Sequence, residues 1–260
     1  RVYEASGMYS IEAVKQATNT VKIDRTVPTT SDDYGAKNDV WQNADQTIIL
    51  TPADPAPSSG FAWTKYCTDA VNNCDPTSGT TYTVPVVINT AGTSYFRYAS
   101  QDNADNLQTT VSKTVKIDKT VPAVSSITAP AGGSYKKGTV TITATASDNV
   151  GGSGIAKVEF YAGAEKIGED TTASYSLDWN TTGLNGGYSL TAVAIDLAGN
   201  TTTSGAVVIH VDNTAPTVTI VLAGGFAVNA NQMAFSPNGD TIMDSIGIDV
   251  AFSESVDYSI

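Results

Sequence analysis

The stretch GTVTITATAS (residues 138–147) decides the fold, because apolar side chains alternate with threonine along its length. A period of two residues is typical of a β-strand that buries one face and exposes the other. Turn-forming clusters, such as DNVGGSG (148–154) and NGG (185–187), punctuate the chain that follows. Further strands are predicted at 155–162, 173–180, 187–196 and 206–211. Short strands at this spacing predict an all-β sandwich of about seven strands.

A repeat of 94 residues extends this pattern over the rest of the chain. The motif Asp-x-Thr-x-Pro begins at Asp24, Asp118 and Asp212, so both intervals are 94 residues (118 − 24 and 212 − 118). The proline disfavours helix ahead of it, which suits an extended link that enters the first strand of the next unit. Several coincidences in one register indicate one structural unit used repeatedly.

The predicted fold class is therefore all-β, with tandem immunoglobulin-like β-sandwich domains in an elongated array. Complete domains are expected at 25–118 and 119–212. The C-terminal part of a domain is expected at 1–24, and the N-terminal part of a further domain at 213–260. Incomplete domains leave strand edges open, so either the chain is an excerpt of a longer repetitive protein or neighbouring copies complement each other's ends.

The amino-acid composition excludes some classes of binding partner. The chain has 26 acidic against 14 basic residues, for a formal net charge of −12. Such a surface repels phosphate backbones and anionic lipid, so neither nucleic acid nor membrane insertion is expected. No stretch of 18 apolar residues is present, which agrees with that expectation.

The sequence offers no catalytic constellation. Its one histidine, His210, lies in the apolar strand VVIHV (207–211), where a strand-face residue is the favoured interpretation over a catalytic base. There is no Gly-rich phosphate loop entering a helix and no Cys/His zinc spacing. Paired carboxylates could serve a glycosidase, but the aspartates recur in each repeat, which favours a structural duty. The chain is predicted not to be an enzyme.

Three stretches resemble known families. WNTTG (179–183) with AIDLAGN (194–200) resembles the bacterial Ig-like domains found in tandem on secreted enzymes and adhesins, and the likeness covers most of 119–212. YCTD (66–69) with DPTSGTTY (75–82) resembles the C-terminal Ig-like domain of chitobiase and β-hexosaminidase, which implies an accessory module without catalytic residues. FSPNGD (235–240) is similar to the start of the Ig-like domains of flagellar hook-capping and gliding-associated proteins, although Thr241 replaces their usual glycine.

The only two cysteines, Cys67 and Cys74, have six residues between them, and several of those residues favour turns. We predict a local disulfide, with two free thiols as the alternative.

Recurring aspartates provide the sharpest candidate site. In an Ig-like sandwich the B–C and F–G loops lie at the end where the chain enters, so three carboxylates should converge in each repeat. The two predicted groups are Asp24, Asp54 and Asp102, and Asp118, Asp148 and Asp196. Converging carboxylates could hold Ca²⁺ at the joints between domains. The alternative is that they cap turns by accepting backbone N–H hydrogen bonds.

One aromatic residue is a candidate ligand contact. Trp63 lies 94 residues before Lys157, so its side chain is predicted to point outward, where it could stack on a sugar. The alternative is an ordinary exposed aromatic residue without a ligand.

Together these features predict a non-catalytic spacer array of an extracellular bacterial surface protein, such as a stalk, adhesin, appendage or filament component. The expected partners are neighbouring Ig-like domains, other copies of the protein, or a surface glycan or protein. The alternative is an accessory region, with carbohydrate binding as a candidate activity, of a secreted glycoside hydrolase.

Overall fold

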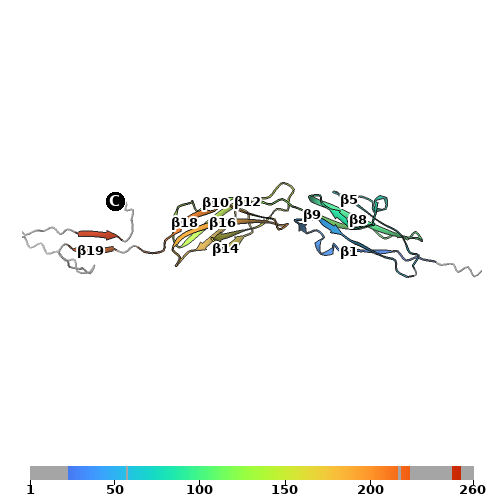
Figure 1. Cartoon of the computed structure of the whole chain (residues 1–260), viewed down its shortest axis with the longest axis horizontal. Helices are drawn as coiled ribbons and strands as arrows, with labels where there is room; N and C mark the ends of the chain where they lie inside the picture. The colour runs from blue at the N-terminus through green and yellow to red at the C-terminus, as the bar shows by residue number, and fades with distance from the viewer. Residues whose placement is uncertain (1–22, 57, 216–217, 223–247, 253–260) are drawn as a thin grey trace, which may run out of the picture. The chain divides into compact units, whose positions relative to one another are not determined.

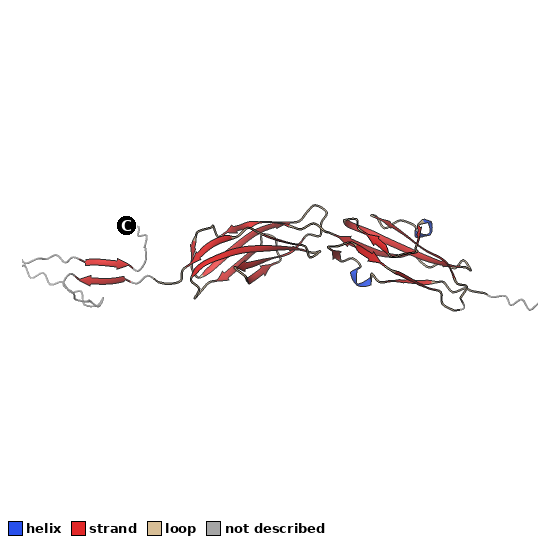
Figure 2. Cartoon of the chain, viewed as in Figure 1, coloured by secondary structure: helices blue, strands red, loops and turns tan. Residues whose placement is uncertain are grey.

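A computed structural model describes residues 23–56, 58–215, 218–222 and 248–252 (Figure 1). The chain forms two compact units. One comprises the described residues up to Ala123 together with Ser147–Ala156 and Ile195–Thr202. The other comprises Val124–Ala146, Lys157–Ala194 and the described residues from Thr203 onward. In the described part of the chain, helix is confined to two short 3₁₀ turns, η1 (Gly35–Lys37) and η2 (Pro76–Ser78) (Figure 2).

The first sandwich has a five-stranded sheet in the order β2-β9-β8-β5-β6 and two strand pairs, β1-β4 and β3-β7. Its strands are β1 (Thr29–Asp32), β2 (Trp41–Gln42), β3 (Gln46–Ile48), β4 (Leu50–Ala53), β5 (Phe61–Asp69), β6 (Thr80–Thr81), β7 (Val86–Ile88), β8 (Gly92–Asp102) and β9 (Val111–Ile117). Strand β2 pairs parallel to β9, and β8 pairs antiparallel to both β5 and β9.

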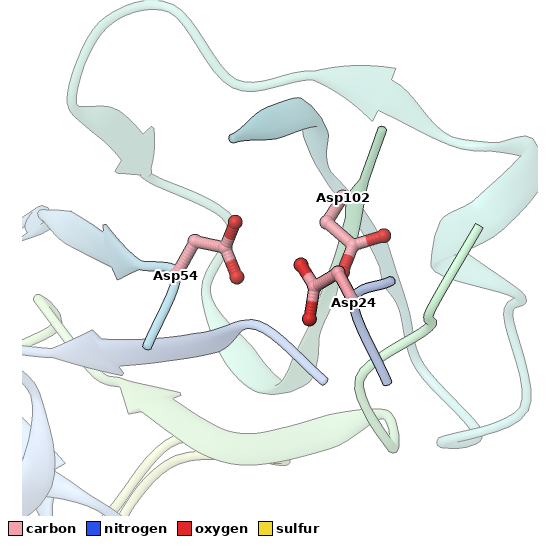
Figure 3. A group of neighbouring side chains, drawn as sticks. All are labelled: Asp24, Asp54 and Asp102. Atoms are coloured by element: carbon pink, nitrogen blue, oxygen red, sulfur yellow. The ribbon is translucent and has the colours of Figure 1, made fainter. Parts of the chain in front are cut away.

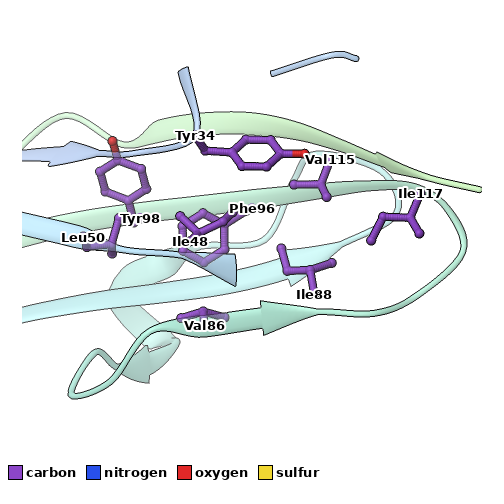
Figure 4. Close-up of a cluster of buried hydrophobic side chains, with 9 residues drawn as sticks. All are labelled: Tyr34, Ile48, Leu50, Val86, Ile88, Phe96, Tyr98, Val115 and Ile117. Carbon is purple, nitrogen blue, oxygen red and sulfur yellow. The ribbon is translucent and has the colours of Figure 1, made fainter. Parts of the chain in front are cut away.

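Alternation along these strands builds one core between the two layers. Ile48, Val86 and Ile88 come from β3 and β7, whereas Phe96 and Val115 come from β8 and β9 (Figure 4). The remaining buried members of this cluster are Tyr34, Leu50, Tyr98 and Ile117. Full burial of an aliphatic or aromatic side chain stabilises the fold by about 1.5–3 kcal/mol each, so this cluster is the main force that holds the layers together.

The second sandwich has a three-stranded sheet, β10-β12-β15, and a larger sheet in the order β11-β18-β16-β13-β14, with β17 paired to β16. Its strands are β10 (Ala123–Ala129), β11 (Tyr135–Lys136), β12 (Thr139–Ser147), β13 (Ile155–Ala162), β14 (Glu165–Asp170), β15 (Ser176–Asn180), β16 (Gly186–Asp196), β17 (Thr201–Thr203) and β18 (Val207–Val211). Buried side chains come from both sheets, among them Val140, Ile142, Phe160, Leu190 and Ile209. Beyond it, β19 (Val218–Leu222) pairs antiparallel to β20 (Ile248–Phe252).

These strands confirm the predicted all-β, Ig-like fold, although each sandwich has nine strands (β1–β9 and β10–β18) rather than the expected seven or so. One predicted strand also starts later than expected. The strand expected at 173–180 begins only at Ser176. Asp170 explains the delay, because its carboxylate accepts hydrogen bonds from the Thr172 and Ser176 N–H groups and holds 171–175 as a loop. Ser174 in that loop has a positive φ of 66°.

The 94-residue offset reappears in the hydrogen bonds. The Asp118 N–H donates to the Gln42 carbonyl and the Asp212 N–H to the Lys136 carbonyl, both at 2.9 Å. Likewise, Asn103 N–H donates to Gly60 and Leu197 N–H to Gly154. The repeat therefore extends from sequence to backbone pairing.

Candidate functional site

Each Asp-x-Thr-x-Pro motif begins with a local turn. The carboxylates of Asp24, Asp118 and Asp212 accept a hydrogen bond from the N–H of the threonine two residues later, at 3.0, 3.0 and 2.9 Å. Aspartate commonly fixes a turn in this way. The turn alone therefore explains why each motif begins with aspartate, without any bound ligand.

The second oxygen of the same carboxylate reaches a distant loop. In the first group, Asp24 Oδ2 accepts from the Ser59 N–H at 2.7 Å, and in the second, Asp118 Oδ2 accepts from the Ser153 N–H at 2.7 Å. Ser59 and Ser153 differ by 94 positions, so the contact recurs with the repeat. These serines were not among the predicted site residues, although the common offset could have revealed them.

The structure brings together all six predicted aspartates in their two predicted groups. One group, the first triad, consists of Asp24, Asp54 and Asp102, and Figure 3 shows their carboxylates directed into one space. The other, the second triad, consists of Asp118, Asp148 and Asp196. In each triad one carboxylate oxygen per residue lies within 4.8 Å of the others. Both triads lie within the first compact unit.

Asparagines complete both triads. Asn106 donates from Nδ2 to Asp102 Oδ2 at 2.8 Å and to the Asp24 carbonyl at 3.3 Å. Asn200 makes the equivalent bonds to Asp196 Oδ2 and the Asp118 carbonyl, at 2.8 and 2.9 Å. The amide therefore ties the loop aspartate to the backbone of the link residue.

A glycine allows the remaining loop aspartate to be capped. The Gly60 N–H donates to Asp54 Oδ2 at 2.8 Å, and the Gly154 N–H donates to Asp148 Oδ2. These glycines have φ values of 82° and 84°, a left-handed conformation that favours glycine.

The triads concentrate negative charge in partly buried surroundings. Asp102, Asp118 and Asp196 are 0, 2 and 2% exposed. Within the described part of the chain, no lysine, arginine or histidine nitrogen lies within 4.0 Å of any of the six carboxylates. Burial raises the pKa of Asp118, but hydrogen bonds from Ser153 and Thr120 outweigh it and leave that pKa below its ordinary value. Backbone N–H groups, rather than cations, supply the compensating positive potential.

The two triads differ in one respect. All carboxylate oxygens of the second triad accept a hydrogen bond. In the first triad, Asp54 Oδ1 is buried without a hydrogen-bond partner, and so is the neighbouring Ser59 Oγ. In the second triad the Ser153 Oγ accepts from the Ala198 N–H at 3.2 Å. Only the first triad thus has unused oxygen atoms.

The predicted disulfide is present. Cys67 and Cys74 are joined, with their Cα atoms 6.2 Å apart. Asp69 shapes the loop between them, because its carboxylate accepts the N–H groups of Asn72, Asn73 and Cys74 at 2.7–2.8 Å.

Trp63 and His210 lie on the sides of their strands that face away from the core. Trp63 is half-buried on β5, opposite Gln101 on β8, with Lys65 Nζ 4.8 Å from the ring centroid. His210 on β18 is half-buried and stacks on Tyr135, with ring centroids 5.0 Å apart. The Tyr135 contact carried no signal in the sequence, because the two residues are 75 positions apart.

The sandwich and its repeated loops agree with what comparison of sequences finds. Residues 122–192 match the bacterial Ig domain family. This Ig-like match includes most of the second sandwich, from β10 into β16. The motif at 235–240 that resembles hook-capping Ig-like domains lies outside the described residues, as does the segment 1–22. The finer resemblances to chitobiase and hook-capping domains remain predictions.

The chain is also similar to parts of several individual proteins. Exoglucanase B of Cellulomonas fimi is 36% identical over 126 residues, which are 45% of this chain and 11% of the relative. The fibronectin(III)-like modules of Clostridium thermocellum CbhA are 29% identical over 36% of this chain and 99% of theirs, with a TM-score of 0.32. The D00-D0 domain of intimin is 14% identical over 70% of this chain and 99% of its own, with a TM-score of 0.33. No helix in the described ranges is long and apolar enough to cross a bilayer.

Proposed function

We propose that this chain is a non-catalytic spacer within a secreted bacterial protein, built from Ig-like domains at 25–118 and 119–212. The observation that supports this proposal is a repeated hydrogen bond. Asp118, which follows β9, accepts the Ser153 N–H in the loop before β13, and Asp24 accepts the Ser59 N–H in the loop before β5. In each case the contact holds the link aspartate against a loop of the same compact unit, which favours a structural role for the link. A stalk, adhesin or filament component would use a segment of this kind to hold another domain away from a surface.

Single-molecule force spectroscopy tests this organisation. Two unfolding events are expected, each releasing about 94 residues, or a contour length of about 300 Å. The disulfide provides an internal control, because it shortens the release of the first domain by about 25 Å until a reductant is added. One event that releases both repeats together would contradict two independent spacer domains.

A place beside a glycoside hydrolase domain is the second candidate. It is supported by the 36% identity to part of an exoglucanase, of which this chain spans 11%. In that setting, deletion of the segment from the full-length protein should leave hydrolysis of a soluble substrate unchanged and reduce hydrolysis of an insoluble one. Equal loss on both substrates would argue against a separate accessory role.

Calcium binding is a proposal for the first triad. The three carboxylates of this triad, with one oxygen of each within 4.8 Å of the others, repel one another, and they offer the oxygen ligands that Ca²⁺ prefers. The unused Asp54 Oδ1 and Ser59 Oγ favour the first triad over the second, in which turn capping already occupies every carboxylate oxygen.

Thermal unfolding with CaCl₂ and with EDTA tests the calcium proposal. Saturating Ca²⁺ is expected to raise the midpoint of the first domain by about 5 °C relative to EDTA. The Asp54→Asn variant should lose this shift, whereas the matched Asp148→Asn variant should keep it. Equal midpoints in Ca²⁺ and EDTA for the unmodified chain would leave turn capping as the sole role of both triads.

A further inference from the structure

A turn of the second sandwich places an asparagine directly before a glycine. Gly186 is the first residue of β16 and Asn185 precedes it, and both residues are exposed. Gly186 has a φ of 110°, in the region of backbone conformation that favours glycine. The turn therefore requires the residue type that has no side chain to shield its backbone nitrogen from the amide group of the preceding asparagine.

The first sandwich has the same turn without the asparagine. Gly92 lies 94 residues before Gly186, has a φ of 93° and also begins its strand, β8. Ala91 takes the place of Asn185. The turn thus forms without a side-chain amide, and Asn185 makes contacts that belong to the second sandwich alone.

These contacts hold the link that follows β18. Asn185 Oδ1 accepts hydrogen bonds from the Asn213 N–H at 2.7 Å and from the Thr214 hydroxyl at 3.4 Å. The Asn213 side chain makes further hydrogen bonds of 2.7–2.8 Å with the backbone of Gly138, Thr181 and Leu184. All of these residues belong to the second compact unit. The Asn185 amide is therefore one of the groups that fix the link 212–214 to its own sandwich.

The same hydrogen bonds favour a reaction between Asn185 and its neighbour. Attack of the Gly186 backbone nitrogen on Asn185 Cγ places negative charge on Oδ1, the atom to which Asn213 and Thr214 already donate. Donors held in position at a developing oxyanion lower the barrier to its formation. Among the described residues, no hydrogen bond holds the Asn185 Nδ2 group, which is the leaving group of this reaction.

We propose that Asn185 and Gly186 form a site of spontaneous deamidation that loosens the link 212–214. A base from solvent removes the Gly186 N–H proton, and the nitrogen forms a bond to Asn185 Cγ. The Cγ–Nδ2 bond then breaks, and Nδ2 takes up a proton and leaves as ammonia. Water opens the resulting succinimide at either carbonyl and gives aspartate or isoaspartate at position 185. In isoaspartate the main chain gains a methylene group and the side chain loses it, which displaces the oxygen that accepted the Asn213 N–H.

Peptide mapping of the intact chain tests the site. The chain is incubated in mildly alkaline buffer and digested with chymotrypsin, and a freshly prepared sample digested in parallel gives the background. Peptide 180–188, between the cuts after Trp179 and Tyr188, should lose most of its unmodified form and yield two isomers. Fragmentation in the mass spectrometer should locate the replacement of NH₂ by OH at Asn185.

Asn180 is a matched control within the same peptide. It is also exposed, and its Oδ1 also accepts a hydrogen bond, from the Thr182 N–H at 3.0 Å. It precedes Thr181, which is buried and β-branched, so its neighbour's nitrogen is shielded. Asn180 should stay unmodified. An unmodified Asn185 after incubation, or equal conversion of Asn180, would overturn the proposed site.

Hydrogen exchange measures the effect on the link. Protection of the Asn213 N–H should fall in proportion to the isoaspartate formed, while amides in β16 and β18 stay protected. Asn185→Ala carries the residue of the first repeat and cannot form the succinimide, so it should lack this protection from the start and not change with time. Full protection of Asn213 in the converted chain would overturn the effect on the link. The unfolding events expected of a spacer do not depend on this result.

Discussion

At the scale of single residues, the contribution of a buried carboxylate to the free energy of unfolding depends on how many backbone N–H groups donate hydrogen bonds to it. Asp102 accepts the N–H groups of both Ala104 and Asn106, whereas Asp196 accepts only that of Asn200 from the backbone. Asp102→Ala should therefore lower the free energy of unfolding by about 3 kcal/mol, since an unsatisfied buried group costs about 1–3 kcal/mol. Asp196→Ala should cost about half as much. Urea unfolding followed by circular dichroism compares the two, and equal losses would contradict this account.

At the scale of elements, two interactions fix the conformation of the loop after β5: the Cys67–Cys74 disulfide and the hydrogen bonds that the Asp69 carboxylate accepts. Closing a loop of this length stabilises the fold by about 2.5 kcal/mol in the chain-entropy account, so Cys67→Ser with Cys74→Ser should cost about that amount. Hydrogen exchange should still show protected Asn72 and Asn73 amides in that variant, because Asp69 accepts them. Asp69→Ala with the disulfide intact should lose the protection, and the reverse pattern would assign the loop's shape to the disulfide.

At the scale of the whole molecule, acid should destabilise the fold. Hydrogen bonds and lysine partners lower the pKa of many carboxyls, and Lys157 and Lys166 bring the pKa of Glu159 to about 2. The other carboxyls with lowered pKa are Asp24, Asp32, Asp69, Asp75, Asp118, Asp170 and Glu169. Their stabilising effect is complete above the unfolded values near pH 4 and is lost as the pH falls toward 2. Thermal midpoints at pH 6, 4, 3 and 2 measure this, and a midpoint unchanged to pH 2 would contradict it.

Much of this architecture follows from local sequence. Alternating threonine and apolar residues determine the strands, since β-branched side chains suit a half-buried pleated surface. The 94-residue offset determines which loops are equivalent, and the loop layout of an Ig-like sandwich predicts that Asp118, Asp148 and Asp196 converge, so this grouping could be predicted without coordinates. The Cys67–Cys74 pairing was equally accessible, because only two cysteines exist and turn residues separate them.

Only the tertiary structure decided which atoms remain free and which distant side chains meet. Asp54 Oδ1 lacks a hydrogen-bond donor and Asp148 Oδ1 has one, a difference in loop geometry that periodicity does not specify. The Tyr135–His210 stack depends on parallel pairing between a two-residue strand and one 75 positions later. Periodicity assigns a residue to a face of its own strand, but the neighbouring strand is chosen by packing of the whole sandwich. For this reason the aspartate groups could be predicted from the sequence, whereas the Tyr135–His210 stack became known only from the fold.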